Sequence, residues 1–482
     1  MGHAAILGTS SHVGKSIVTA GIIRVLAQEG VRVAPFKAQN MALNAFVTLD
    51  GGEIGYAQAL QAWAAGVEPT VDMNPILLKP EPGHRSQVIV HGKVQGTAHA
   101  ASFRGRRVWL REAAIESFER LQRAYDVLVM EGAGSPVELN LMEGDLSNLL
   151  LPRHAKAALV LVGDIDRGGV FASLYGTVQL LPAEDRARLK GLIVNKFRGD
   201  VSLFEEGLGI LESLCQVPVL GVLPFLSFGL PDEDSVSLEG KPDSWASKGL
   251  RASVVVLPHI SNFTDLLALE AEPEVSLAWQ RTPPRERPDL LIIPGSKGTL
   301  FDLAWLFESG WADAIRRWRD EGTTIIGICG GMQMLGQRVD DPEGVEGDPD
   351  SHPGLGLIPA ITRMNRGKRV KRRKAQVVAS ELEPVGVEGY EIHNGDTVFL
   401  DTPRPLLTFD GDDDGWISPD GKVLGTYLHG MLDEGAFRRT LLARWGIDAG
   451  RGDNPIEAGL TKLEGVIREH VGVETLFRLV GI

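Results

Sequence analysis

The chain has 482 residues, more than one hydrophobic core usually serves, so we expect two or three domains. Hydrophobic residues make up 43% and charged residues 23% of the sequence, as in an ordinary globular protein, and no apolar run reaches the length of a membrane span. A net charge of −14 argues against nucleic-acid or anionic-membrane binding, and two cysteines exclude a disulfide framework, so we expect a cytoplasmic protein.

A phosphate-binding loop is predicted near the start of the chain. Residues 4–8 form a short apolar strand, the loop that follows ends in Gly14, Lys15 and Ser16, and a helix pattern comes next. In this context backbone N–H groups hold phosphate oxygens, Lys15 reaches the outer phosphates and Ser16 can ligate Mg²⁺. Five residues, rather than the usual four, separate Gly8 from Gly14. This variant resembles dethiobiotin-synthetase-like P-loop ligases, which activate a carboxylate by phosphorylating it.

Polar residues follow the later strands of this half. The strands are predicted at residues 31–36, 125–130, 157–162, 192–194 and 217–223. Open α/β sheets bind ligands at the carboxyl ends of their strands. Glu131 and Asp164 are therefore candidate Mg²⁺ contacts, and Asn195 and Lys196 are candidates for reading an adenine edge. Each acid taken alone is as readily a solvated loop residue, but the alternating β/α order favours a parallel-sheet α/β domain.

Two segments of this half have less specific patterns. Arg104–Arg107 form a basic region together with Lys79, Arg85 and Lys93. This region is either a solvated face or a seat for a polycarboxylate substrate. Residues 241–250 are polar and rich in Gly, Pro and Ser, and we place the domain linker there.

A nucleophile is predicted at Cys329, where a buried strand over residues 323–328 meets a helix. Such a turn pushes the side chain clear of the backbone, and Gly327 and Gly330 leave room for the turn and for a substrate. The N–H of Gly330 is placed to stabilise an oxyanion or a thiolate, so we expect a lowered pKa for Cys329. An inert buried thiol is the commoner fate of a lone cysteine, but the glycine-flanked elbow favours a nucleophile.

The base for Cys329 is predicted at His429, after a strand pattern over residues 423–428. Gly295 follows another strand pattern and can offer a second N–H to an oxyanion. A cysteine followed by a histidine about a hundred residues later is the layout of a class I glutamine amidotransferase domain. Many such domains carry a glutamate two residues after the histidine, where this chain has Met431. The site is therefore either a Cys–His dyad or a triad that takes its acid from elsewhere.

Two further segments of this half are polar or charged. Residues 389–395, GYEIHNG, place polar side chains in an apolar frame, and we expect them near the glutamine pocket. Residues 363–374 are densely basic, and we expect a flexible, solvated loop there. The alternative is that this basic segment docks an anionic substrate or the other domain.

A P-loop half joined to a Cys–His amidotransferase half without the usual glutamate resembles the cobyrinate amidotransferase family. The segments that carry the resemblance run over nearly the whole chain, at residues 39–48, 50–55, 74–80, 131–140, 164–171, 195–200, 261–265, 294–297, 329–336 and 390–393. The resemblance implies two α/β domains, with a P-loop domain at 1–240, a linker at 241–250, an amidotransferase domain at 251–440 and a helical extension at 441–482.

The resemblance also implies a function in cobalamin biosynthesis. The enzyme would amidate the b, d, e and g carboxylates of a corrinoid, adenosylcobyrinic acid a,c-diamide, to give adenosylcobyric acid, using ATP, Mg²⁺ and glutamine. The implied ATP site comprises Gly8, Gly14, Lys15, Ser16, Asn195 and Lys196, and the implied Mg²⁺ contacts are Ser16, Glu131 and Asp164. The implied catalytic residues are Cys329 and His429, with Gly330 and Gly295 as oxyanion donors. No nucleic-acid or membrane partner is expected, and the oligomeric state is open.

Three alternatives stay open from the sequence. Cobyrinic acid a,c-diamide synthase shares both chemistries but amidates two positions, and the segments 39–48 and 164–171 favour the enzyme that amidates four. A ParA-like ATPase shares the P-loop but has no use for Cys329 and His429, and Ser10 stands where that family has an extra lysine. A binding protein with a degenerate amidotransferase domain is suggested only by the missing glutamate.

Overall fold

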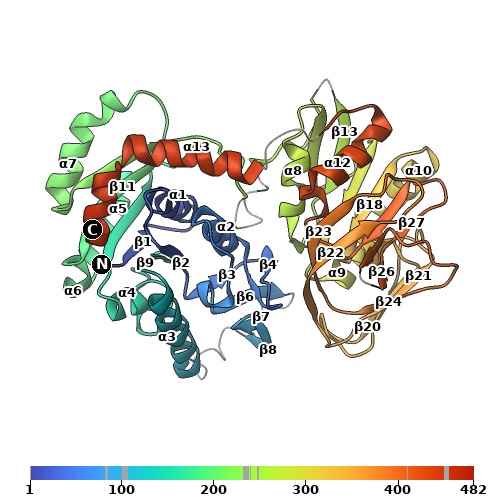
Figure 1. The fold of residues 1–482 in the computed structure, drawn as a ribbon, viewed down its shortest axis with the longest axis horizontal. Coiled ribbons are helices and arrows are strands. Elements are labelled where there is room, and N and C mark those ends of the chain that lie inside the picture. Colours follow the sequence, from blue (N-terminus) through green and yellow to red (C-terminus); the bar gives the residue numbers. More distant parts are fainter. Residues whose placement is uncertain are drawn as a thin grey trace.

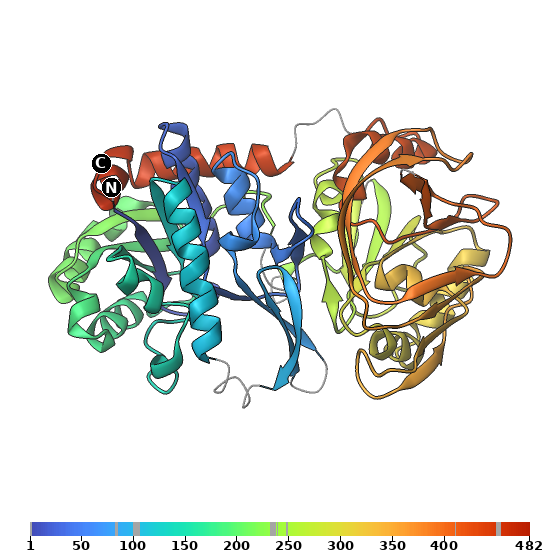
Figure 2. The ribbon, with the colours of Figure 1, turned by 60° about the horizontal axis from the view of Figure 1, so that its bottom comes forward.

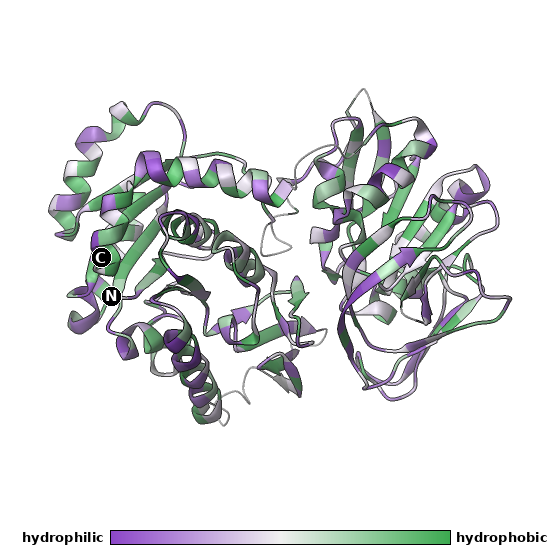
Figure 3. Cartoon of the chain, in the orientation of Figure 1, coloured by the Kyte–Doolittle hydropathy of each residue, from purple (hydrophilic) through white to green (hydrophobic). Residues whose placement is uncertain are grey.

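The computed structural model describes residues 2–81, 85–99, 107–231, 238, 240–246, 249–409, 411–449 and 455–482. The chain forms two lobes side by side, each built on a six-stranded sheet (Figure 1). Apolar residues concentrate on the central strands of both lobes, and the outer helices carry hydrophilic residues on their outward faces (Figure 3). In the part of the chain described, no helix is both long and apolar enough to cross a bilayer.

The sheet of the first lobe is parallel throughout, with the order β12-β11-β10-β1-β9-β2. Its strands are β1 (Ala4–Gly8), β2 (Val33–Phe36), β9 (Val127–Glu131), β10 (Ala158–Asp164), β11 (Leu189–Phe197) and β12 (Val219–Pro224). Every residue of β1 and β9 is buried, because helices cover both faces of the sheet. The P-loop that follows β1 therefore emerges between the carboxyl ends of β9 and β10.

Helices pack on both faces of this sheet. They are α1 (Lys15–Gln28), α2 (Tyr56–Ala64), α3 (Arg107–Ala124), α4 (Leu150–His154), α5 (Val170–Leu180), α6 (Ala183–Arg186) and α7 (Glu205–Cys215). One hydrophobic core lies between the sheet and α3, α5 and α7, and a second core holds α1 on the opposite face. The helix predicted from residue 17 begins two residues earlier, so Lys15 is its first residue.

The C-terminal helices α13 (Pro455–His470) and α14 (Val473–Val480) return to the first lobe. Leu463 and Ile467 of α13 pack against α1 at Gly21, where a side chain would lie 2.6 Å from Ile467. The N–H of Gly2 donates to the carbonyl of Val480 at 2.7 Å, so the two ends of the described chain meet (Figure 2). A helical extension was expected here, but the sequence did not indicate that it packs on the N-terminal lobe.

Two small sheets extend the first lobe toward the second (Figure 2). One has the order β3-β6-β7-β8 and the other pairs β4 with β5. Their strands are β3 (Gln39–Met41), β4 (Ala45–Val47), β5 (Glu53–Gly55), β6 (Ile76–Glu81), β7 (Arg85–Val90) and β8 (Lys93–His99). Of the predicted basic region, residues 104–106 lie outside the described residues. Lys79 on β6 is only 3% exposed, so it does not belong to a solvated face.

The second lobe has the sheet order β15-β13-β16-β18-β28-β27, parallel except for the edge strand β27. Its strands are β13 (Leu250–Val255), β15 (Val275–Gln280), β16 (Leu290–Ile293), β18 (Thr324–Ile328), β27 (Trp416–Ile417) and β28 (Val423–Thr426). Its helices are α8 (Leu267–Glu270), α9 (Thr299–Glu308), α10 (Trp311–Asp320), α11 (Gly330–Leu335) and α12 (Gly435–Leu442). The short strands β14 (Ile260–Ser261) and β17 (Gly295–Ser296) pair beside this sheet.

Two four-stranded sheets complete the second lobe. Their strands are β19 (Arg338–Asp341), β20 (Asp350–Pro353), β21 (Ala360–Arg363) and β24 (Asp396–Phe399), then β22 (Arg369–Val377), β23 (Gly386–His393), β25 (Leu407–Phe409) and β26 (Asp412–Asp414). The prediction of a solvated loop over residues 363–374 is wrong, because most of this segment is β22 and β21. Lys368 and Arg372 form ion pairs with Glu53 and Glu68 of the first lobe. Their charges are therefore used in docking the two lobes.

The seam between the lobes is buried and specific. Asn262 accepts the N–H of Ala45 through Oδ1 at 3.0 Å, and Asn44 accepts the N–H of Phe263 at 3.2 Å. The Phe46 ring lies 5.4 Å from that of Tyr390, edge to face. Each lobe thus supplies side chains that satisfy buried backbone groups of the other.

Candidate active site

Cys329 lies on a strained turn between β18 and α11. Its φ of 54° and ψ of −111° are rare for a residue with a side chain. Close packing of the following glycines enforces the turn, since a side chain at Gly331 would lie 2.0 Å from the carbonyl oxygen of Ile293. Cys329 is 7% exposed, and its Sγ lies 3.7 Å from the carbonyl oxygen of Ile392 on β23. The predicted elbow therefore exists, with a mostly buried sulfur.

His429 faces Cys329 and is held by a carboxylate from another part of the lobe. Its backbone pairs with Tyr390 in both directions, at 2.9 and 3.1 Å, which fixes it after β28. The imidazole hydrogen-bonds Cys329 on one side. On the other, Nδ1 lies 2.7 Å from Oδ2 of Asp265, and the second oxygen of this carboxylate accepts the N–H of Gly430 at 2.9 Å. Cysteine, histidine and aspartate thus form one connected arrangement.

Asp265 is the acidic partner of His429, which the sequence alone did not identify. It lies in a 3₁₀ turn (Phe263–Leu266) that follows β14, far from His429 in the chain. The segment 261–265 contributed to the family resemblance but no role was assigned to it. A usable signal was present: Asp265 follows strand β13 at the same sheet edge as Cys329, where side chains from different strands converge.

The charges around His429 favour its protonated form. Burial opposes the imidazolium, but the negative charges of Asp265 and Cys329 outweigh burial and raise the pKa of His429 to about 10. Asp433 lies in the same neighbourhood, where burial and the charge of Asp265 raise its pKa well above the usual range. The neutral form of Asp433 is therefore favoured beside Asp265. The side chain at Met431 is buried in the core.

Gly295 lies beside His429 and the elbow of Cys329. A side chain on Gly295 would come 3.3 Å from Cε1 of His429, and one on Gly330 would come 3.0 Å from the backbone nitrogen of Ser296. The turn at 295–296 therefore packs directly on the elbow of Cys329. The backbones of the two predicted oxyanion donors, Gly295 and Gly330, are thus brought close together from separate segments, and an oxyanion is held by N–H groups that converge on it.

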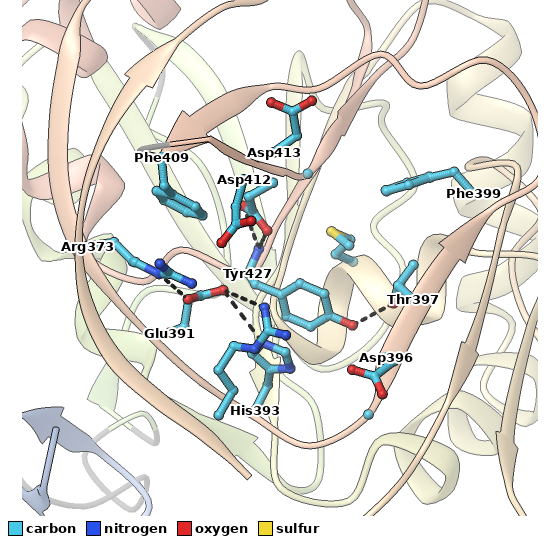
Figure 4. Close-up of a pocket in the computed structure, with 15 residues that line it drawn as sticks. Arg373, Glu391, His393, Asp396, Thr397, Phe399, Phe409, Asp412, Asp413 and Tyr427 are labelled. Carbon is cyan, nitrogen blue, oxygen red and sulfur yellow. Dashed lines mark hydrogen bonds and ion pairs between the residues drawn. The ribbon is translucent and has the colours of Figure 1, made fainter. Parts of the chain in front are cut away.

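The segment 389–395 divides its side chains between two sides of β23. Tyr390 and Ile392 pack in a core with Phe46 at the seam. Glu391 and His393 point instead into a cavity of about 130 Å³ behind the strand (Figure 4). This segment was expected near the glutamine pocket, and two of its backbone carbonyls do lie near Cys329. The carbonyl of Ile392 contacts Cys329 itself, and that of Asn394 accepts the side-chain amide of Gln333 at 3.0 Å.

The P-loop of the first lobe brings together most of its predicted residues. Gly14 has φ of 93°, and a side chain there would lie 2.2 Å from Nδ2 of Asn195, so only glycine fits. Lys15 donates to the carbonyls of Ser10 at 2.9 Å and Gly134 at 3.1 Å. Its ammonium group therefore lies across the mouth of the loop, at the carboxyl ends of the strands.

The residues present fit a magnesium ion at Ser16 and Glu131. Ser16 Oγ donates to Oε1 of Glu131 at 2.8 Å, so two oxygens of the kind Mg²⁺ prefers are adjacent. Lys37 and Gln61 also contact this carboxylate, at 2.9 and 2.6 Å. Asp164 ends the strand on the other side of β1, where it accepts from Lys196 and from the N–H of Asp166, each at 2.9 Å. The described contacts therefore do not bring Asp164 together with the other two.

Asn195 and Lys196 both contact the P-loop backbone. Asn195 donates to the carbonyl of Val13 at 2.8 Å, and Lys196 donates to the carbonyl of His12 at 2.6 Å. Beside them opens a cavity of about 1000 Å³, whose walls come from the P-loop, α2, α8, α13 and residues 224–231. This is the upper end of the range for ligand pockets.

A buried charge cluster closes the seam near these sites. Glu53 accepts Lys79 at 2.6 Å and Lys368 at 2.5 Å, and Lys368 also donates to Gln87 at 2.9 Å. Burial lowers the pKa of Lys368 to about 7, and the ammonium groups of Lys79 and Lys297 add to this effect while Glu53 opposes it. One lysine of the seam therefore exchanges its proton near neutral pH.

We expect a measurable pH dependence of stability from Lys368. The folded protein releases this proton above about pH 7, whereas the unfolded chain keeps it up to about pH 10.5, so rising pH stabilises the fold in that window. The thermal midpoint of the unaltered protein should rise with pH relative to that of Lys368→Met. Parallel midpoint curves for the two proteins between these pH values would show that Lys368 does not titrate there.

Comparisons with known proteins agree with this architecture. Residues 4–228 match the family described as CobQ/CobB/MinD/ParA nucleotide binding domain, and residues 251–437 match the CobB/CobQ-like glutamine amidotransferase domain. A protein named cobyric acid synthase from Pelotomaculum thermopropionicum is 45% identical over 99% of this chain and 96% of its own length. Proteins of the same name from Acaryochloris marina and Salmonella agona are 46% and 43% identical, over 92% and 98% of this chain and 90% and 97% of their own lengths.

A nucleotide-binding lobe fused to a glutamine amidotransferase lobe defines a class of enzymes, the glutamine-dependent amidoligases. With relatives of this identity along almost its entire length, the chain belongs to the cobyric acid synthase family. The resemblance and the two-domain α/β fold class inferred from the sequence are thereby confirmed.

Proposed function

We propose that this enzyme converts adenosylcobyrinic acid a,c-diamide to adenosylcobyric acid in cobalamin biosynthesis, by amidating the b, d, e and g carboxylates with ATP and glutamine. The observation that carries the proposal is the connected Cys329–His429–Asp265 arrangement, which abuts the P-loop lobe through a buried seam. It occurs in a chain that aligns along nearly its full length with proteins named cobyric acid synthase. We assign residues 1–240 to the ligase domain, 251–440 to the amidotransferase domain and 441–482 to a helical extension.

In the ligase domain, the P-loop prepares a substrate carboxylate for attack by ammonia. Lys15 holds the γ-phosphate for transfer to the carboxylate, which gives an acyl phosphate and converts a poor leaving group into a good one. Ser16 and Glu131 would hold Mg²⁺, which neutralises phosphate charge when bound. Asn195 and Lys196 keep the loop in shape through its backbone carbonyls and border the cavity in which we place the nucleotide.

In the amidotransferase domain, Cys329 attacks the side-chain amide of glutamine. His429, as an imidazolium beside the Cys329 thiolate, holds the proton and delivers it to the leaving ammonia. Asp265 keeps the imidazole ring oriented. The N–H groups of Gly330 and Gly295 stabilise the negative charge that forms on the carbonyl oxygen of the amide when its carbon is attacked. Water then hydrolyses the thioester and regenerates the thiol.

The ammonia passage, in our proposal, follows a row of buried carboxamide side chains. Asn262 Nδ2 lies 3.4 Å from Nε2 of His429 at one end. Across the seam, Gly55 leaves room for the amides of Asn40 and Gln58, which would lie 2.5 and 2.8 Å from a side chain at that position. At the other end, Gln61 donates to Glu131 beside the P-loop. A buried route keeps ammonia unprotonated and therefore nucleophilic.

The decisive experiment is mass spectrometry of the product formed from the a,c-diamide, ATP and glutamine labelled with ¹⁵N in its amide, in the presence of unlabelled ammonium. A parallel reaction with unlabelled glutamine should give the mass loss of four amidations, because replacing a carboxyl OH by a ¹⁵N-labelled amide leaves the nominal mass unchanged. The labelled reaction should then show the label retained in each new amide. Two amidations would indicate the diamide synthase instead, and none would favour an ATPase or binding protein. Four amidations with the label diluted by bulk ammonium would refute the passage while leaving the reaction intact.

A further inference from the structure

The turn at residues 295–296, called here the oxyanion turn, is held to the first lobe by a buried ion pair. Lys297 follows the turn, and its Nζ lies 2.9 Å from Oε1 of Glu81, the last residue of β6. The side chains of Lys297 and Glu81 are only 13% and 4% exposed. The partners come from different lobes and are distant in sequence, so the pair exists only when the lobes are docked.

The other restraints on this turn come from within the second lobe. β17 pairs with β14, and the N–H of Lys297 donates to the carbonyl of His259 at 2.9 Å. Ser296 Oγ donates to Asp302 at 2.6 Å. These bonds hold the turn to the second lobe. Among the contacts that the structure describes, Glu81 is the residue of the first lobe that contacts the turn, through Lys297. The position of the turn therefore depends partly on where β6 lies.

The strand β6 is itself locked by buried charge. Lys79, two residues before Glu81 on the same strand, is 3% exposed and pairs with Glu53 at 2.6 Å. Glu53 in turn accepts Lys368 of the second lobe at 2.5 Å. A displacement of β6 would disturb both pairs, and a buried charge that loses its partner is costly. The strand β6 thus has a well-defined position in the docked protein, and the ion pair between Glu81 and Lys297 places the oxyanion turn relative to it.

The turn is close enough to the chemistry for small shifts to matter. A side chain on Gly330 would lie 3.0 Å from the backbone nitrogen of Ser296, so the turn and the Cys329 elbow are in contact. Oxyanion donors act only within a few tenths of an ångström of their ideal distance, and their contribution appears in the transition state rather than in substrate binding.

We propose that Glu81 is a positioning residue for glutamine hydrolysis: through Lys297 it aligns the oxyanion turn, so that the glutaminase works at full rate only when the ligase lobe is docked. This proposal rests on the proposed function. It makes hydrolysis of glutamine dependent on the lobe that consumes the ammonia. Glu346 also faces Lys297, so loss of the Glu81 charge leaves the lysine with one acidic neighbour and the fold can survive.

The test compares Glu81→Gln with the exchanged double variant Glu81→Lys/Lys297→Glu and with Glu321→Gln, an exposed glutamate on the far side of the second lobe. For Glu81→Gln we expect the kcat of glutamine hydrolysis to fall about tenfold or more, with an unchanged KM for glutamine and unchanged amidation from ammonium chloride. The exchanged variant should recover part of the kcat, and Glu321→Gln should match the unaltered enzyme.

Each other outcome has a distinct meaning. Unchanged hydrolysis in Glu81→Gln, or an equal loss of hydrolysis and ammonia-driven amidation, would overturn the positioning role, the second because it indicates general structural damage. A rise in KM with constant kcat would also overturn it, because ground-state binding would then be affected. Failure of the unaltered enzyme to hydrolyse glutamine would contradict the proposed function itself.

Discussion

Replacing Cys329 by serine should abolish amidation from glutamine while leaving amidation from ammonium chloride intact. The thiolate is the attacking group, and loss of a covalent nucleophile in comparable hydrolases lowers kcat by on the order of 10⁶-fold. The P-loop lies in the other lobe and Cys329 does not line the cavity beside it, so the synthesis of the acyl phosphate is untouched. Parallel assays of product formation with each nitrogen source check this expectation.

The matched control is Lys15→Ala in the first lobe. Without its ammonium group the γ-phosphate is no longer held, so this variant should lose amidation from both nitrogen sources, while Cys329 remains able to hydrolyse glutamine. Glutamine-dependent amidation by Cys329→Ser at the normal rate would show that another residue is the nucleophile. Equal loss of both activities in that variant would point instead to a disturbed seam.

The two α/β lobes were predictable because their central strands are apolar and end in glycine-bearing turns. Parallel pairing at the centre of each of the two six-stranded sheets leaves β1 and β18 buried on both faces, which makes them continuous hydrophobic runs in the sequence. Lys15 and Cys329 were found because a P-loop and a nucleophile elbow depend on local backbone geometry. Such geometry is set by glycines close in sequence, such as Gly14 and Gly331.

The features that escaped prediction depend on contacts between distant segments. The basic segment at 363–374 was interpreted as solvated because its partners, Glu53 and Glu68, lie about three hundred residues away. Its charges pair across a seam that no local pattern reveals. The packing of α13 on α1 is of the same kind. The carboxylate partner of His429 was expected two residues after it in the sequence, whereas the folded chain supplies this carboxylate from Asp265.

Replacing Asp265 by asparagine should slow glutamine hydrolysis by up to about 10⁴-fold, the loss seen when the carboxylate of a comparable triad becomes an amide. The negative charge of this carboxylate helps to raise the pKa of His429 to about 10 against the effect of burial. Without that charge, burial prevails and the pKa falls, so the imidazolium loses its proton at lower pH. We therefore expect the alkaline limb of the kcat/KM profile for glutamine to move to lower pH.

Asp433→Asn provides the control for this change, because Asp433 is buried nearby and its raised pKa favours the neutral acid. An asparagine there resembles the protonated acid, so activity and pH profile should stay close to those of the unaltered enzyme. If Asp265→Asn behaved like Asp433→Asn, the site would operate as a Cys–His dyad and the 2.7 Å contact with His429 would be structural only. Since Met431 occupies the place of the usual glutamate, a large effect of Asp265→Asn alone would show that the acid has moved to the loop after β14, beside the seam. Asn262 in that same loop accepts the N–H of Ala45 from the ligase lobe, so the orientation of His429 would then depend on how the two lobes dock.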